Sequence, residues 1–315
     1  MRGKKKTVWK IVLLILVCLA VLATLALKWL ASRPAVADNY AQTVQTGGEL
    51  EAKYLQNGTH DVSYKEASVM QSFGKYEIWY PSDLETGDAQ YPVVIFCNGT
   101  GVKASKYTAV MKHLASWGFV VMATEEEYSW NGFGAEMCLR FAMKMNAQEQ
   151  VHDWKSNPFL GKLDLEHIGV SGHSQGGVGV INAATNIKHA SMVKAVFAAS
   201  PTWPELATAL EWDYDASKLT VPTFLLAATG KTDSETICPL AGLQKIYDTI
   251  PDSTAKLMTR RNDGDHGNML YSADGYMTAF FLWQLQGDEE AARAFTGENA
   301  EILSNTHYQD TQISQ

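Results

Sequence analysis

The chain has 315 residues, of which 46% are hydrophobic and 19% charged, so it is neither a disordered nor a fibrous protein. Its net charge is -8, but residues 1–33 hold seven Lys and Arg and no acid, which leaves 19 basic and 34 acidic residues in the remainder. An acidic body without a basic stripe argues against a nucleic-acid partner.

An unbroken apolar run of 17 residues covers positions 11–27. A helix of that length, at about 1.5 Å per residue, just crosses a hydrocarbon core of about 30 Å, and flanking apolar residues lengthen it. More basic residues precede the run than follow it closely, which places the body outside the cytoplasm by the positive-inside rule. We therefore expect residues 1–37 to form one N-terminal transmembrane or signal helix, with membrane contact through residues 11–27.

The alternative is a cleaved signal peptide, because residues 35–37 have the small-x-small form of a cleavage site. Ala37 lies ten residues beyond the apolar run, with Lys28 and Arg33 between them, and this favours the uncleaved anchor. The two possibilities are a cell-membrane protein with its domain outside the cytoplasm, and a secreted protein cleaved after Ala37. A lipid anchor on Cys18 is disfavoured, since this residue lies inside the run.

Residues 38–61 are polar and weakly periodic, and we expect them to be a tether or leading segment. Short apolar or alternating runs predict strands, and helical spacing of apolar residues predicts helices. In chain order, the expected strands are 76–80, 92–97, 118–124, 167–170, 195–199, 223–228 and 256–259, and the expected helices are 107–116, 135–150, 175–186 and 276–286. This alternation predicts an α/β domain over residues 62–290 with a mostly parallel, doubly wound sheet, followed by a C-terminal tail at 291–315.

Three cysteines lie in the body, namely Cys97, Cys138 and Cys238, so at least one is unpaired within it. They are interpreted as small buried hydrophobic residues, and one disulfide among them is left open. No Cys/His cluster has the spacing of a zinc site, and neither HExxH nor GxxxxGK[ST] occurs. We predict neither a metal nor a cofactor.

The sharpest local motif is GHSQGG at 172–177, which contains GxSxG. It follows one expected strand and begins an expected helix. At such an elbow the serine adopts a strained turn, which Gly172 and Gly176 are small enough to permit. We predict Ser174 as a nucleophile at the carboxyl edge of the sheet, and His173 beside it as a structural residue.

A serine nucleophile requires a base and a carboxylate. Asp233 lies in the loop that follows a predicted strand, and Glu235 is the alternative acid in the same loop. Only two of the eight histidines follow this loop: His266 lies in a turn-rich segment and His307 in the polar tail. The predicted triad is therefore Ser174, Asp233 and His266, in the order typical of this kind of elbow.

Negative charge on the attacked carbonyl oxygen needs two N–H donors. We predict the backbone N–H of Gln175 as one donor, and that of Gly99 or Thr100 as the other. Asn98-Gly99-Thr100 also has the form of a glycosylation sequon, but a loop in the site would not tolerate a glycan.

Three aromatic residues, Trp203, Trp130 and Tyr128, lie just after predicted strands. They are candidates for the wall of an apolar substrate pocket, and ordinary packing in the core or on the surface is the alternative. Residues 125–127 are three consecutive Glu, expected to form a solvated rim that disfavours anionic substrates nearby.

These segments together resemble the polyesterase–lipase–cutinase group of α/β hydrolases, and more distantly chlorophyllases and dienelactone-hydrolase-like esterases. The resemblance covers about residues 62–287 and is carried by YPVVIFCNGTG (91–101), LASWGFVVMAT (114–124), GKLDLEHIGVSGHSQGG (161–177), FAASPTWPE (197–205), VPTFLLAATGKTDSETICP (221–239) and GDHGNML (264–270). It implies an α/β-hydrolase fold, ester hydrolysis without a metal, an aromatic wall of the acyl cleft at Trp203, and an oxyanion N–H from the loop 98–101.

Two departures from this group bear on the substrate. GHSQGG replaces the GWSMGG or GHSMGG of polyester hydrolases, and the loop 98–101 lacks their aromatic residue, which argues against polyester. We predict an exported serine hydrolase that cleaves a small-molecule or lipid-like carboxylic ester through an acyl-enzyme. The alternatives are a peptidase or acyltransferase with the same triad, and a non-catalytic surface binding protein.

Overall fold

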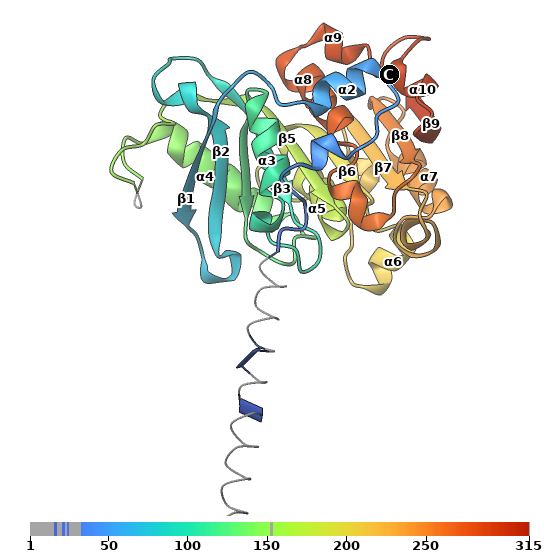
Figure 1. Cartoon of the computed structure of the whole chain (residues 1–315), viewed down its shortest axis with the longest axis horizontal. Coiled ribbons are helices and arrows are strands. Elements are labelled where there is room, and N and C mark those ends of the chain that lie inside the picture. The colour runs from blue at the N-terminus through green and yellow to red at the C-terminus, as the bar shows by residue number, and fades with distance from the viewer. Residues whose placement is uncertain (1–15, 18–20, 23, 25–32, 152–153, 315) are drawn as a thin grey trace, which may run out of the picture. The chain divides into compact units, whose positions relative to one another are not determined.

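The computed structural model describes residues 33–151 and 154–314, together with residues 16, 17, 21, 22 and 24 (Figure 1). The chain divides into two units, Met1–Ala35 and Val36–Gln315. The helix expected at 11–27 falls almost entirely outside the described residues. Among the residues that are described, no helix is both long and apolar enough to cross a membrane.

In the described part of the second unit, nine strands form one sheet in the order β1-β2-β4-β3-β5-β6-β7-β8-β9. Neighbours from β4 to β8 in this order are parallel, whereas β1, β2 and β9 pair in antiparallel fashion. The strands are β1 (Val62–Ser68), β2 (Lys75–Pro81), β3 (Tyr91–Cys97), β4 (Val120–Thr124), β5 (Leu163–His173), β6 (Val193–Ala199), β7 (Thr223–Ala228), β8 (Lys256–Arg261) and β9 (Tyr308–Ser314). The predicted α/β fold with a mostly parallel sheet is confirmed.

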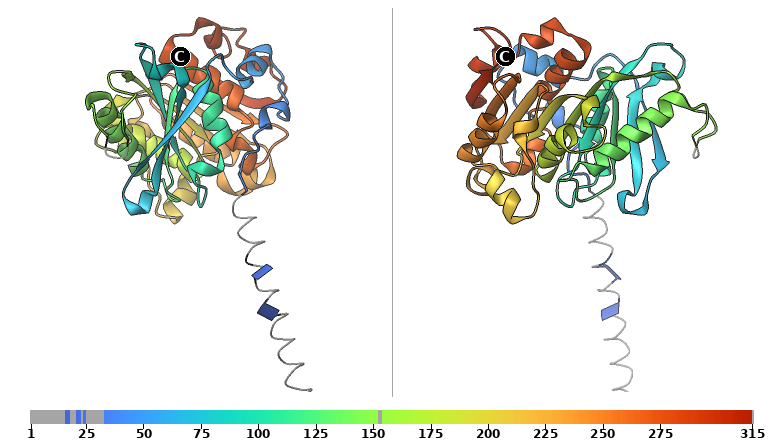
Figure 2. Two further views of the ribbon diagram at one scale, coloured as in Figure 1. Left: turned by 60° about the vertical axis from the view of Figure 1, so that its left-hand side comes forward. Right: turned by 180° about the vertical axis from the view of Figure 1, so that it is seen from behind.

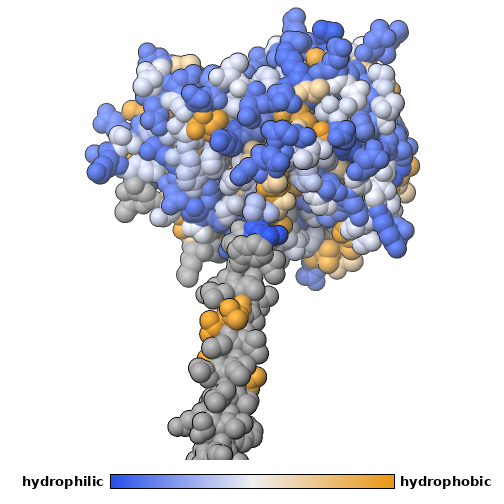
Figure 3. Space-filling view, viewed as in Figure 1, coloured by the Kyte–Doolittle hydropathy of each residue, from blue (hydrophilic) through white to orange (hydrophobic). Residues whose placement is uncertain are grey.

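Helices cover both faces of the sheet, because successive residues of a strand point to opposite sides. On β3, Val93 and Ile95 share a core with α4, α5 and α7, whereas Val94 and Phe96 share another with α2, α3 and α8. The helices are α2 (Glu49–Leu55), α3 (Thr108–Ser116), α4 (Phe133–Ala147), α5 (Gln175–Thr185), α6 (Pro204–Ala209), α7 (Leu240–Thr249), α8 (Asp274–Gln286), α9 (Glu289–Ala292) and α10 (Glu301–Ser304). Figure 1 shows α2 and α3 in front of the sheet, and the view from behind in Figure 2 shows α4 in green. The face in Figure 3 is mostly hydrophilic, so the helices on it direct their apolar sides inward.

The chain reverses its winding direction at β3. From β3 it passes through α3 to β4 on one side, and then through α4 to β5 on the other side of β3. The carboxyl ends of β3 and β5 therefore form a topological switch point, where sheets of this class bind ligands. The loops after β6, β7 and β8 leave the sheet at the same edge, because these strands are parallel to β5.

The structure differs from the expected tether and tail at the two ends of the domain. Within residues 38–61, α2 forms and Tyr40, Tyr54 and Leu55 are buried. The segment 308–314 is β9, which pairs with β8 and closes one edge of the sheet. Each segment contributes only a few apolar residues to the core, among them Tyr54 of α2 and Tyr308 of β9, so its sequence shows little periodicity.

A buried ion pair joins these two end segments. Arg261 of β8 donates to the Glu51 carboxylate of α2 at 2.8 Å and to the Tyr308 hydroxyl of β9 at 2.6 Å. Asn305 donates to the second oxygen of Glu51 at 2.7 Å. Glu51 is 1% exposed and Arg261 4%, so each charge has lost its water and depends on the other.

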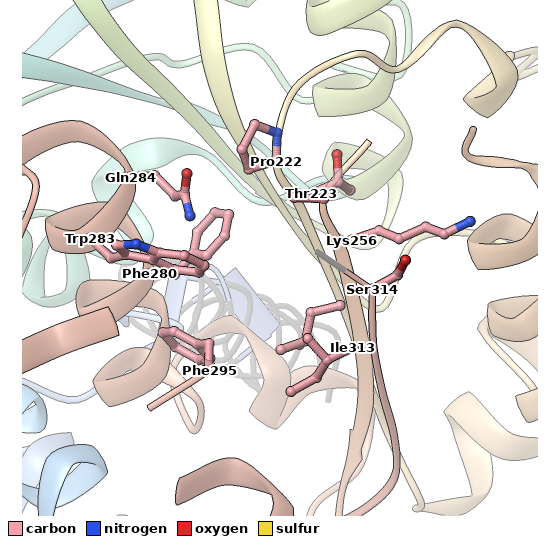
Figure 4. Close-up of a pocket in the computed structure, with 11 residues that line it drawn as sticks. Pro222, Thr223, Lys256, Phe280, Trp283, Gln284, Phe295, Ile313 and Ser314 are labelled. Carbon is pink, nitrogen blue, oxygen red and sulfur yellow. The ribbon is translucent and has the colours of Figure 1, made fainter. Parts of the chain in front are cut away.

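A small apolar hollow lies at the amino ends of β7 and β8, away from the switch point (Figure 4). Phe280 and Trp283 of α8 line it together with Phe295 and Ile313, while Lys256 extends away from these rings. Its volume of about 20 Å³ is that of a site for a single water molecule. An organic ligand does not fit there.

Replacing Glu51 by Gln leaves the Arg261 charge buried without a counter-charge, and we expect the free energy of unfolding to fall by about 3 kcal/mol. Urea denaturation at pH 7 measures the change. Glu49→Gln, on the exposed side of the same helix, is the control and should shift the free energy by less than about 0.5 kcal/mol. Equal effects of the two variants would contradict a role for the ion pair.

Candidate active site

Ser174 lies at the turn between β5 and α5 with φ 62° and ψ -122°, a backbone conformation that residues with a side chain rarely adopt. The turn is tight, because a Cβ atom on Gly176 would lie 2.0 Å from the carbonyl oxygen of Cys97. The N–H of Ser174 donates to the Ala199 carbonyl of β6 at 2.9 Å, which holds the turn at the sheet edge. The elbow predicted from GxSxG is therefore present.

The structure brings Ser174, His266 and Asp233 into one hydrogen-bonded chain. The Nε2 atom of His266 lies 2.9 Å from the Ser174 Oγ, and its Nδ1 atom lies 2.7 Å from the Asp233 Oδ1. A carboxylate accepts only, so Nδ1 carries the proton and Nε2 is left to accept the serine proton. Residues separated by 92 and 33 positions along the chain thus meet because parallel strands end at one edge.

Glu235, the alternative acid, and His307, the other histidine after its loop, do not join this series of hydrogen bonds. The Glu235 carboxylate is 63% exposed and lies 3.9 Å from the Lys231 ammonium. His307 faces Asp263 at 3.2 Å and does not enter the chain of bonds around Ser174.

Asp233 is fully buried, and both of its carboxylate oxygens have partners. Its Oδ2 accepts from the Ser200 hydroxyl at 2.5 Å and from the Ala228 N–H at 2.8 Å, while Oδ1 faces His266. Ser200 was not among the predicted site residues. Its place directly after an expected strand, at the edge that carries the other loops, is the signal that identifies it.

His173 contacts both the backbone and the ring of His266. Its Nε2–H donates to the His266 carbonyl at 2.7 Å, and the two rings lie 4.5 Å apart between centroids. Burial, and to a smaller extent the neighbouring charge of His266, lower the pKa of His173 to about 4. The ring is therefore neutral at neutral pH, which suits a donor to a carbonyl oxygen next to another imidazole.

The side chain of Asn98, which no prediction included, holds the loop after β3 in place. It is 1% exposed, and its Nδ2 donates to the carbonyl oxygens of Thr124 and Glu126, both at 2.7 Å. Its Oδ1 accepts from the Tyr107 hydroxyl. The buried amide, with both hydrogens donated, leaves no room for a glycan at this sequon.

The predicted oxyanion donors lie on either side of the nucleophile. A Cβ atom on Gly99 would lie 3.6 Å from the Cβ of Ser174, whereas Thr100 is exposed one residue further along. Gln175 begins α5 directly after Ser174, at the positive end of the helix dipole. Its side chain is buried and accepts from the Ser129 N–H at 2.8 Å, a contact that fixes the loop after β4 against the elbow.

The aromatic candidates lie on loops at this edge but face different neighbours. Trp203, at the start of α6, packs on α7, where a Cβ atom on Gly242 would lie 2.5 Å from the Trp203 Cβ. Trp130 follows β4, and its carbonyl accepts from Asn182 of α5 at 2.8 Å. Tyr128 is 62% exposed. A substrate-binding role for Trp203 and Trp130 stays a prediction.

The expectation that residues 125–127 are a solvated rim is wrong for Glu126. Its side chain is 7% exposed, and its carboxyl lies where a Cβ on Gly134 of α4 would be. Glu125 instead accepts from the N–H of Ser105 at 2.7 Å, and Glu127 is exposed. The middle residue turns inward because the loop packs beneath Asn98, and burial raises the pKa of Glu126 to about 7.

Cys97, Cys138 and Cys238 are buried thiols that form no disulfide with one another. Burial raises the pKa of the Cys97 thiol, so it is not a nucleophile near neutral pH. Over the described residues, no group of three or more His, Cys, Asp or Glu is placed to hold a metal ion.

Proteins of known family that are similar in sequence to this chain agree with this architecture. The model of a family described as PET hydrolase-like matches residues 38–296. A bis(hydroxyethyl) terephthalate hydrolase of Streptomyces coelicolor is 27% identical over 227 residues, which are 70% of this chain and 64% of that protein. Cutinase est1 of Thermobifida alba is 28% identical over 227 residues, 70% of this chain and 67% of its own length. Cutinase 1 of Thermobifida cellulosilytica is 27% identical over 216 residues, 67% of this chain and 72% of its own length.

The buried Glu126 predicts a pH-dependent effect on stability. With a folded pKa of about 7 against 4.5 in the unfolded chain, the folded state binds more protons between these values, so stability falls as pH rises through this window. Glu126→Gln cannot ionise and should therefore gain melting temperature over the parent chain at pH 8 but much less at pH 5. Glu127→Gln, its exposed neighbour, should show no such trend. A gain for Glu126→Gln that is the same at both pH values would contradict the assignment.

Proposed function

The chain belongs to the PET hydrolase-like family, and we propose that it is a serine hydrolase that cleaves carboxylic esters. The observation that carries the proposal is the bonded chain from the Ser174 hydroxyl through His266 to the buried Asp233, at 2.9 and 2.7 Å. A serine hydroxyl becomes nucleophilic when a base accepts its proton, and a carboxylate on the far side of the imidazole stabilises the resulting positive charge.

In the proposed reaction, the Ser174 Oγ attacks the ester carbonyl while its proton passes to the His266 Nε2. The tetrahedral intermediate expels the alcohol, which takes this proton from His266, and an acyl-serine remains. Water then loses a proton to His266 as it attacks the acyl carbon, and Ser174 regains its proton when the acid leaves. Asp233 holds the imidazole through Nδ1 throughout.

The developing oxyanion would bind to the N–H of Gln175 and to that of Gly99 or Thr100. Gly99 lies against Ser174, and the side chain of Asn98 fixes its loop, which supports a donor that is held in position before the substrate arrives. Donors that need no rearrangement during the reaction stabilise the transition state more than mobile ones.

For the substrate we propose a small-molecule or lipid-like ester, with Trp203 and Trp130 beside the acyl group. The names of the relatives point to bis(hydroxyethyl) terephthalate and cutin as the compounds to compare first. The GHSQGG motif and the loop 98–101 differ from the forms typical of polyester hydrolases, whereas the matching family is PET hydrolase-like, so a polyester has to be compared directly with small esters. A series of p-nitrophenyl esters of increasing acyl length, with a polyester film alongside, would measure this preference.

Replacing Ser174 by Ala should lower kcat for p-nitrophenyl butyrate by more than about 10⁴-fold. Fluorophosphonate labelling, read by mass spectrometry, should modify the parent chain at Ser174 and leave this variant unmodified, with an unchanged melting temperature. Ser191→Ala, an exposed serine outside the site, serves as the control and should keep full activity. A folded Ser174→Ala that retains turnover would refute the proposal.

We also propose that residues 11–27 remain attached and hold the domain on the outer side of the membrane. Val36 is 1% exposed and its N–H donates to the Lys106 carbonyl at 3.3 Å. Cleavage after Ala37 would therefore remove a packed residue, which supports the retained segment over the secreted form.

Fractionation of cells that express the full-length chain tests the proposal that residues 11–27 remain attached. The protein should remain in the membrane pellet after an alkaline wash, with an N-terminus upstream of residue 38, and Ala37→Arg should leave its distribution unchanged. Recovery in the medium of a chain that begins at Asp38 would contradict it.

A further inference from the structure

Asp265, the residue before His266, is bonded to two of the loops that form the site. Its Oδ1 accepts from the backbone N–H of Thr232 at 2.9 Å, of Asp233 at 3.2 Å and of His266 at 2.7 Å. Its Oδ2 accepts from the Thr232 hydroxyl at 2.7 Å. One carboxylate thus connects the peptide group of the proposed acid with that of the proposed base.

The two loops run side by side from the ends of β7 and β8. The N–H of Thr229 donates to the Arg261 carbonyl at 2.9 Å, and the N–H of Gly230 donates to the Gly264 carbonyl at 2.9 Å. A Cβ atom on Gly230 would lie 2.6 Å from the Cβ of Asp265, so only glycine permits this approach. The Asp265 carboxylate adds a further contact between the two loops, at the backbone of Asp233 and His266, whose side chains belong to the triad.

Asp265 is itself held in orientation. Its N–H donates to the Asn268 Oδ1 at 2.9 Å, and its carbonyl accepts from the Asn268 N–H at 2.8 Å, at the start of the short helix His266–Leu270. Partial desolvation raises the pKa of Asp265, but the bonds from Thr232, His266 and Asp233 outweigh it and lower the pKa to about 2. The carboxylate is therefore ionised at neutral pH, and charged acceptors form the stronger hydrogen bonds.

We propose that Asp265 is a positioning residue, which sets the distance between the Asp233 carboxylate and the His266 imidazole by binding the backbone of both loops. The proposal rests on the proposed function, in which these two residues assist Ser174. Asp265 acts only through His266 and Asp233, and its contribution is geometric. Small displacements of reacting groups are costly, since a shift of about 1 Å lowers a rate by about 100-fold.

Three variants separate geometry from charge. Asp265→Ala removes all four bonds, whereas Asp265→Asn keeps an oxygen for the backbone N–H groups and loses the charge. Asp263→Asn is the matched control, because Asp263 lies in the same loop but faces His307, and Asn tolerates its left-handed φ of 58°.

With p-nitrophenyl butyrate, Asp265→Ala should lower kcat by about 100-fold with little change in KM, because binding of the ester does not involve this residue. Asp265→Asn should recover most of that loss, and Asp263→Asn should match the parent chain. If folded Asp265→Ala keeps kcat within about threefold, or if Asn fails to restore what Ala loses, the positioning role is overturned.

A proton NMR spectrum gives a readout that does not depend on turnover. The His266 Nδ1 proton, which bonds to Asp233, should appear as a far-downfield resonance that His266→Ala abolishes. It should persist in Asp265→Asn and in Asp263→Asn, and disappear or broaden in Asp265→Ala. Persistence in Asp265→Ala would overturn the proposal even if the parent chain hydrolyses no ester, an outcome that would separately refute the proposed function.

Discussion

The fully buried carboxylate of Asp233 is the constraint on which the site depends. A charge without water is stable only when hydrogen bonds replace its hydration. Here the replacements come from three different strand ends: Ser200 follows β6, Ala228 ends β7, and His266 follows β8. The three loops must therefore stay in register with one another, and the parallel order of the sheet brings them to one edge.

The fold could be predicted where a segment is buried on both sides. Runs such as 92–97 and 223–228 are almost wholly apolar because helices cover both faces of the central strands, and short apolar runs of this kind indicate strands. In the edge strand β9 only Tyr308 is buried, and the sequence has no such pattern. The helix α7 does carry a signal, in the spacing of Leu243, Ile246 and Tyr247, although it was not among those expected.

The three residues of the proposed triad could be predicted, because their chemistry depends on residue type and on order along the chain. Ser174, Asp233 and His266 are the residue types that such a chain of bonds requires, each in a loop after a strand. Asn98 and Asp265 could not be identified in this way, because their partners are mainly backbone groups of other loops. Backbone groups are the same at every position, so residue spacing carries no information about which of them a side chain will meet.

The order in which parts of the domain can fold during synthesis is constrained by one buried set of contacts. It joins Glu51 to Arg261, Asn305 and Tyr308. Synthesis proceeds from the N-terminus, so Glu51 of α2 emerges 210 residues before Arg261, which neutralises it, and 254 residues before Asn305, which covers it. Until Arg261 has left the ribosome, Glu51 has no counter-charge, and a buried carboxylate without one is unfavourable. Docking of α2 is therefore a late step in the folding of the domain, because it waits for Arg261 of β8 and for Asn305 and Tyr308 around β9.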